Sequence, residues 1–150
     1  MHMMTLRRLG WFFIVKMIII SQKPIRSGSP VVSDEPFNAV VCRSGPCGGT
    51  AGQLLHRLRA AVGRCPHGVL ISTSCMLRAA RCRRGQDHES GAYLLVQPCS
   101  LDRRPLGIAI RVGPVLTDAD AAAVADWLAG PSLDVTRLEP RLRMPAWHAR

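Results

Sequence analysis

Between residues 37 and 63, the pattern of apolar positions changes from one typical of a strand to one typical of a helix. Val40 and Val41 are β-branched and end a short apolar run that is followed by turn residues. Between residues 51 and 62, apolar side chains recur every three or four positions, as on one face of a helix. Gly63 ends that pattern. We therefore predict a strand at 37–41 and a helix at 51–62.

The second half continues with three strands and a helix. Apolar runs bounded by turn residues predict strands at 69–74, 93–97 and 106–112, and Thr117 begins a capped helix that runs to residue 128. A helical connection allows the first two strands to be parallel, and a short turn allows the last two to form a hairpin. The order β-α-β-β-β-α predicts an α/β fold with a mixed sheet of about four strands and helices packed on it.

The two ends of the chain are expected to lie outside this fold. Residues 6–20 are basic and then apolar, but Lys16 interrupts them and neither apolar half has the roughly 18 residues needed to span a bilayer. We expect 1–36 to be a flexible extension, and membrane association of 6–20 is the less favoured interpretation. The polar, Arg-rich stretch 132–150 is expected to be a tail, which leaves a domain at 37–131.

Composition narrows the classes of function. The chain has 150 residues, a formal charge of +10 and a pI near 10.6, so it attracts polyanions and acidic proteins. One Tyr and three Phe are too few for the aromatic surfaces on which single-stranded nucleic acids stack, and no DNA-binding motif occurs. No specific nucleic-acid partner is expected. Neither a Ser-His-Asp order nor a nucleotide-binding motif occurs, so we do not expect an enzyme.

Cysteine positions carry the strongest chemical signal. Cys42 and Cys47 occupy the turn after the first predicted strand, and Cys75 follows the second. Carboxyl ends of neighbouring parallel strands meet at one edge of a sheet, where α/β proteins place their sites. Without a clear secretory signal we expect a cytoplasmic protein, in which thiols serve metal or redox chemistry.

The segment Cys42-Arg-Ser-Gly-Pro-Cys47, followed by Cys75, resembles the thioredoxin-like [2Fe-2S] ferredoxins over about residues 37 to 130. That family includes a subunit of respiratory complex I and small actinobacterial ferredoxin-domain proteins. The resemblance implies a thioredoxin-like fold, a [2Fe-2S] cluster and one-electron transfer. It also implies that Cys42, Cys47 and Cys75 are cluster ligands.

The fourth ligand departs from the family pattern. The pattern places a cysteine where this chain has Ala79. Cys82 is the substitute that we expect, although an ideal helix would separate it from Cys75 by a rise of roughly 10 Å, so an irregular loop is required. Cys99 is a second candidate, whereas Cys65 is expected at the opposite end of the sheet.

Two alternatives to the cluster remain open. One is the same scaffold without a cluster, acting as a structural or interaction protein. The other is a zinc or thiol-disulfide site on the same cysteines. If a cluster is bound, Arg43, Arg78 and Arg81 would surround it and favour docking to an acidic redox protein or a flavoprotein reductase.

Overall fold

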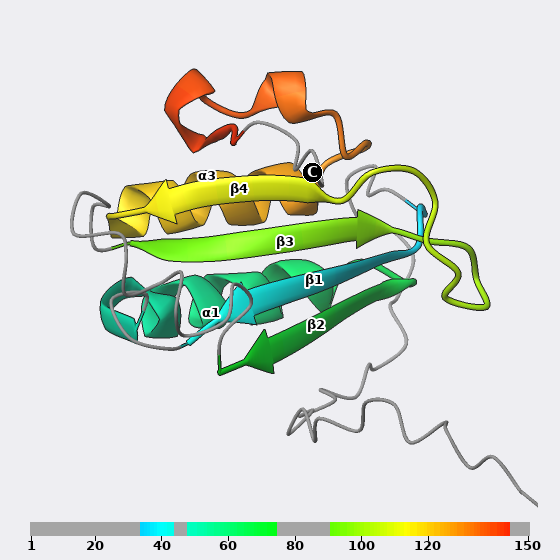
Figure 1. Cartoon of the computed structure of the whole chain (residues 1–150), viewed down its shortest axis with the longest axis horizontal. Coiled ribbons are helices and arrows are strands. Elements are labelled where there is room, and N and C mark those ends of the chain that lie inside the picture. The colour runs from blue at the N-terminus through cyan, green and yellow to red at the C-terminus, as the bar shows by residue number, and fades with distance from the viewer. Residues whose placement is uncertain (1–33, 44–47, 75–90, 145–150) are drawn as a thin grey trace, which may run out of the picture.

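The computed structural model describes residues 34–43, 48–74 and 91–144 of the chain. Within these ranges the chain forms four strands, two α-helices and two short 3-10 helices (Figure 1). In chain order they are β1 (Phe37–Cys42), α1 (Gly48–Val62), β2 (Gly68–Thr73), β3 (Ala92–Pro98), β4 (Ile110–Val115), α3 (Asp118–Leu128), η2 (Val135–Arg137) and η3 (Pro140–Leu142).

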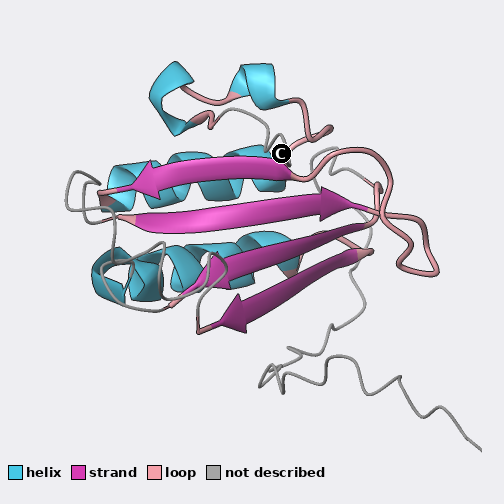
Figure 2. Ribbon diagram, in the orientation of Figure 1, coloured by secondary structure: helices cyan, strands magenta, loops and turns pink. Residues whose placement is uncertain are grey.

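The four strands form one mixed sheet in the order β2-β1-β3-β4 (Figure 2). β1 and β2 are parallel, with Phe37 opposite Gly68 and Cys42 opposite Thr73. β3 runs antiparallel to β1 and pairs with β4 as an antiparallel hairpin. The predicted mixed α/β sheet is thus confirmed, including the parallel crossover through a helix.

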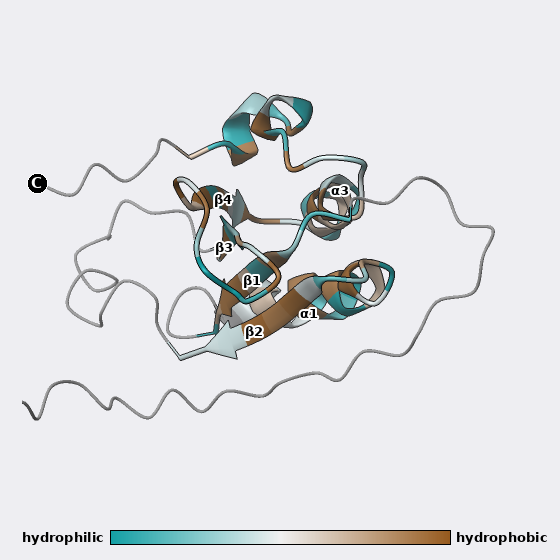
Figure 3. Cartoon of the chain, turned by 90° about the vertical axis from the view of Figure 1, so that its right-hand side faces the viewer, coloured by the Kyte–Doolittle hydropathy of each residue, from teal (hydrophilic) through white to brown (hydrophobic). Residues whose placement is uncertain are grey.

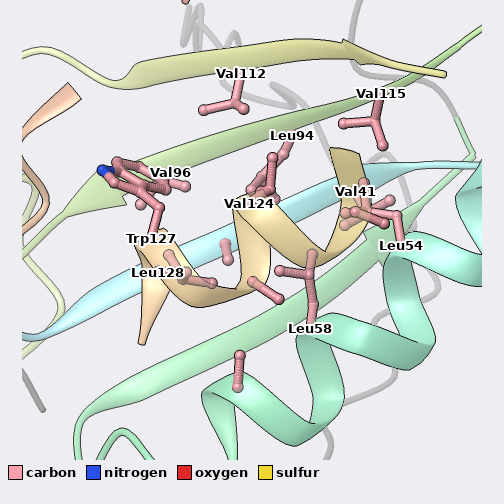
Figure 4. Close-up of a cluster of buried hydrophobic side chains, with 14 of the residues drawn as sticks. Val41, Leu54, Leu58, Leu94, Val96, Val112, Val115, Val124, Trp127 and Leu128 are labelled. Atoms are coloured by element: carbon pink, nitrogen blue, oxygen red, sulfur yellow. The ribbon is translucent and has the colours of Figure 1, made fainter. Parts of the chain in front are cut away.

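Both α-helices cover the same face of the sheet (Figure 3). Burial alternates along β1: Phe37, Ala39 and Val41 are fully buried, whereas Asn38 and Val40 are partly exposed. Side chains from the two helices meet the buried strand residues in one core (Figure 4). The labelled members of that core are Val41, Leu54, Leu58, Leu94, Val96, Val112, Val115, Val124, Trp127 and Leu128.

Helix α3 begins with a capping box, as the sequence predicts. The Thr117 side chain accepts a hydrogen bond from the backbone amide of Asp120, and the Asp120 carboxylate accepts one from the amide of Thr117. Trp127 lies in the core at 4% exposure, and its indole N–H donates to the Asp134 carbonyl at 2.8 Å. Trp127 is therefore a packing residue of the core.

The fourth strand begins later than predicted. β4 starts at Ile110, and the expected strand residues Leu106 and Ile108 belong instead to the loop after β3. Gly107 between them has φ +68°, a left-handed conformation that is incompatible with an extended strand. Leu106 and Ile108 therefore have the alternating apolar pattern of a strand, but they are not part of one.

The predicted boundary at residue 131 is also wrong. Leu133, Leu138 and Leu142 are buried in the core, and the Met144 amide donates to the Arg111 carbonyl of β4 at 3.2 Å. The segment with η2 and η3 covers the outer side of β4 and α3 because its widely spaced leucines reach the core. The fold therefore extends at least to residue 144.

No helix in the described ranges combines the length and the apolar character that crossing a bilayer requires.

Candidate functional site

The carboxyl ends of β1 and β2 lie side by side and bring Cys42 against the backbone that leads to Cys75. Cys42 is opposite Thr73, and the Arg43 amide donates to the Thr73 carbonyl at 2.9 Å. The Cys42 thiol lies 3.9 Å from the carbonyl oxygen of Ser74, a long and weak contact. The predicted meeting of the two strand ends is confirmed up to Ser74.

Cys42 is enclosed, whereas the residue after it faces solvent. Its exposed fraction is 2%, and its thiol is free. Arg43 is exposed at the start of the turn. A buried sulfur beside an exposed cation is compatible with a thiolate ligand near the surface, and equally with an inert thiol packed as a small apolar group.

The first turn of α1 is anchored over the same edge of the sheet by Thr50. Its hydroxyl donates to the Val115 carbonyl at 2.8 Å and accepts from the Ala92 amide at 2.8 Å. These two bonds join α1 to the end of β4 and the start of β3. Sequence reasoning missed this role. The signal for it was a hydroxyl residue in the first turn of a predicted helix, which commonly satisfies nearby backbone groups.

Cys99 lies at the opposite end of the sheet from Cys42. The Cys99 amide donates to the Pro36 carbonyl at 2.9 Å, just before β1 begins. Five residue steps separate Phe37 from Cys42, about 17 Å along the strand. The expectation that Cys99 approaches Cys42 as a fourth ligand is therefore wrong, because antiparallel pairing carries the end of β3 to the start of β1.

Cys65 also lies at that opposite end, as predicted. It follows α1, and its carbonyl accepts from the amide of Gly68, the first residue of β2. Its thiol donates to the Ala61 carbonyl at 3.4 Å, and burial raises its pKa above the ordinary thiol value. These features describe a protonated, structural cysteine.

Cys47, Cys75 and Cys82, together with Arg78 and Arg81, lie outside the described residues. Within residues 34–43, 48–74 and 91–144, no group of three or more His, Cys, Asp or Glu side chains is placed to hold a metal ion. Cys42 is the member of the expected ligand set that falls inside these ranges.

No protein-family model, no curated protein and no solved structure matches this chain. The resemblance to the thioredoxin-like ferredoxins thus rests on the cysteine motif and on the order of elements.

Proposed function

We propose that this chain is a [2Fe-2S] electron carrier, and not a catalyst, whose ligands are Cys42, Cys47, Cys75 and Cys82. The observation that carries the proposal is the contact between the Cys42 thiol and the Ser74 carbonyl, 3.9 Å away. Cys75 follows Ser74 in the sequence, so the proposal brings the third ligand to the backbone that the Cys42 thiol contacts. Two cysteine-bearing turns at one sheet edge supply the thiolates that a cluster of this type needs.

The surroundings of Cys42 are suited to an anionic cluster. Burial of its sulfur limits access of water, a condition that helps to set cluster potential. The first turn of α1 has backbone N–H groups without helical partners, and the positive end of its dipole favours negative charge. When bound, the cluster would supply a one-electron acceptor and donor. Thr50 would keep the start of α1 beside it.

The positive charge near Cys42 suggests a partner with negative charge. Arg43 is exposed directly after Cys42, and the chain carries a formal charge of +10. We propose an acidic redox protein or a flavoprotein reductase as the electron-transfer partner. The proposal also places the protein in the cytoplasm, where thiols stay reduced.

The test is the metal content of the full chain, produced without oxygen and with iron and sulfide available. The proposal expects about two irons and two acid-labile sulfides per chain, with visible absorbance that dithionite bleaches. Cys82→Ser is expected to lower both contents. Zinc without sulfide would replace this proposal with a zinc or thiol-disulfide site, and a folded, metal-free protein would contradict it.

The burial of Cys42 favours one further candidate, the cluster-free scaffold. A free cysteine that is 2% exposed packs like a small hydrophobic residue, and Ala79 would then record a lost ligand. This candidate expects a colourless protein in which Cys42→Ala lowers the thermal transition only by the small cost of the lost sulfur contacts. Its function would lie in binding another macromolecule.

A further inference from the structure

The two edge strands of the sheet, β2 and β4, differ in what lies beside them (Figure 1). The C-terminal segment runs along the outer side of β4, where Val112 pairs with Arg143 and the Met144 amide donates to the Arg111 carbonyl at 3.2 Å. In the described part of the chain, no segment pairs with the outer side of β2. The sheet therefore has one covered edge, at β4, and one open edge, at β2.

The parallel ladder with β1 determines which backbone groups of β2 point away from the sheet. The Arg43 amide donates to the Thr73 carbonyl at 2.9 Å, so Thr73 directs its carbonyl toward β1. Backbone groups alternate in direction along a strand, and the residues next to those that bond β1 therefore point outward. Leu70 and Ser72 are such residues in the register with β1. Their N–H and C=O groups form the row of donors and acceptors that an open edge presents to another strand.

β2 lacks the features that usually prevent an edge strand from pairing. Residues 68–73 include no charged side chain and no proline, and their register with β1 is regular from Gly68 to Thr73. The other edge strand differs on both counts. β4 contains Pro114, which has no N–H group, and its pairing with β3 is irregular. The open edge is thus also the edge whose backbone is competent to pair.

The side chains of β2 favour pairing as well. Leu70 is 3% exposed and belongs to the core beneath the helices. Val69 and Ile71 alternate with it on the opposite face of the sheet, where they are partly buried and Ile71 lies beside Val40 of β1. β-branched side chains in these positions stabilise a strand pair through contacts with the residues directly across from them.

We propose that two copies of this chain join their β2 strands in antiparallel fashion about a two-fold axis at Ile71. In this register Leu70 of each copy lies opposite Ser72 of the other, and each such pair exchanges both of its N–H···O=C bonds. Every outward backbone group of these two residues then has a partner. Ile71 faces its own copy across the axis, and Val69 faces Thr73, so the cross-strand contacts are between β-branched side chains. Since β2 carries no charge, the pairing strands bring no like charges together.

The proposal is independent of the electron-carrier function. Antiparallel pairing directs the carboxyl ends of the two β2 strands in opposite directions. Cys42 lies opposite Thr73 at that end of β2, so the candidate sites of the two copies are at opposite ends of the combined sheet. Each site stays open to a partner.

The experiment is sedimentation equilibrium of the full chain over a range of concentrations, with a reductant present so that no disulfide joins two copies. Ile71→Lys places two ammonium groups opposite each other at the axis. Leu95→Lys, which adds the same charge to the same face of the sheet on β3, is its control. Ser72→Pro removes an outward N–H group, and Ser72→Ala keeps it. Circular dichroism checks the fold of each variant, and the lysine pair serves if Ser72→Pro unfolds.

The proposal expects a reversible monomer–dimer equilibrium whose dissociation constant rises at least about tenfold in Ile71→Lys and in Ser72→Pro. Leu95→Lys and Ser72→Ala should dimerise like the unmodified chain. The proposal is overturned if the unmodified chain is monomeric throughout, or if Ile71→Lys dimerises as tightly as its control. It is also overturned if the dimer is lost in Leu101→Ser/Leu106→Ser/Ile108→Ser, because the exposed side chains of the loop after β3 would then form the interface.

Discussion

Asp120 is a buried carboxylate that joins α3 to the C-terminal segment. It is 2% exposed, accepts from the amides of Leu116 and Thr117 at 2.9 and 3.0 Å, and forms an ion pair with Arg141 of η3. The hydrogen bond from Arg141 holds the pKa of Asp120 well below its usual value, and the two amides act in the same direction against the effect of burial. The ionised form therefore stabilises the fold.

Asp120→Asn is expected to lower the free energy of unfolding by about 1–3 kcal/mol, because the charged partner of Arg141 is lost. The folded pKa is depressed, so this stabilisation is fully present above about pH 4 and is lost as pH falls through the folded pKa. Denaturant titrations between neutral and acid pH measure it. Asp126→Asn, exposed on the same helix, is the control. Equal stability of the Asp120 variant and the unmodified protein at neutral pH would contradict this account.

At the level of elements, the placement of α1 depends on Thr50. Thr50→Val keeps the shape but leaves the Val115 carbonyl and the Ala92 amide without their present partner. We expect a loss of about 1–3 kcal/mol in the free energy of unfolding, and recovery of most of it in Thr50→Ser, which keeps the hydroxyl. Thermal or chemical unfolding measures both. Similar losses in the two variants would assign the effect to side-chain packing.

The sequence predicts correctly those helices and strands that are specified by residues close together in the chain. The β-branched residues before the Cys42 turn and the capping residue Thr117 are local signals, and β1 and α3 form where these signals predict them. β4 differs because its first residue is set by pairing with β3: the pairing begins where Ile110 lies opposite Val96. Leu106 and Ile108 continue the same alternation outside the sheet, and no local signal separates them except Gly107.

The C-terminal segment could not be predicted for a similar reason. Leu133, Leu138 and Leu142 follow neither the helical nor the strand period, so their burial depends on contacts with distant elements. At the candidate site, the parallel crossover predicts that Cys42 meets the end of β2. The prediction for Cys99 was wrong because the sequence alone does not show whether β3 runs parallel or antiparallel to β1. The antiparallel pairing places Cys99 at the end of the sheet opposite Cys42.

At the scale of the whole molecule, the candidate site occupies one end of the sheet. Cys42 and Arg43 lie at one end of the sheet, and the loop of residues 99–109 lies at the other. Under the proposed function, the exposed Arg43 and the net positive charge of the chain should guide an acidic partner to the end that holds Cys42.

Reduction by an acidic flavoprotein reductase is therefore expected to slow as ionic strength rises from about 0.01 to 0.1 M, since the screening length falls from about 30 to 10 Å. Arg43→Ala should weaken that dependence. Arg64→Ala, which removes an exposed arginine at the opposite end, should leave it unchanged. Stopped-flow rates measure both. A rate that is insensitive to salt in the unmodified protein would contradict charge-guided docking.

The most direct measurement compares iron and acid-labile sulfide in Cys42→Ser, Cys65→Ser and Cys99→Ser. All three cysteines are buried and free, with exposed fractions of 2%, 1% and 1%. Each serine variant therefore buries one hydroxyl, and its cost in stability is similar in the three variants. Position in the sheet is what distinguishes them. The account predicts that Cys42→Ser loses most of its iron and sulfide, while the other two variants keep contents close to those of the unmodified chain. Equal contents in all three variants would contradict a cluster at the carboxyl ends of β1 and β2.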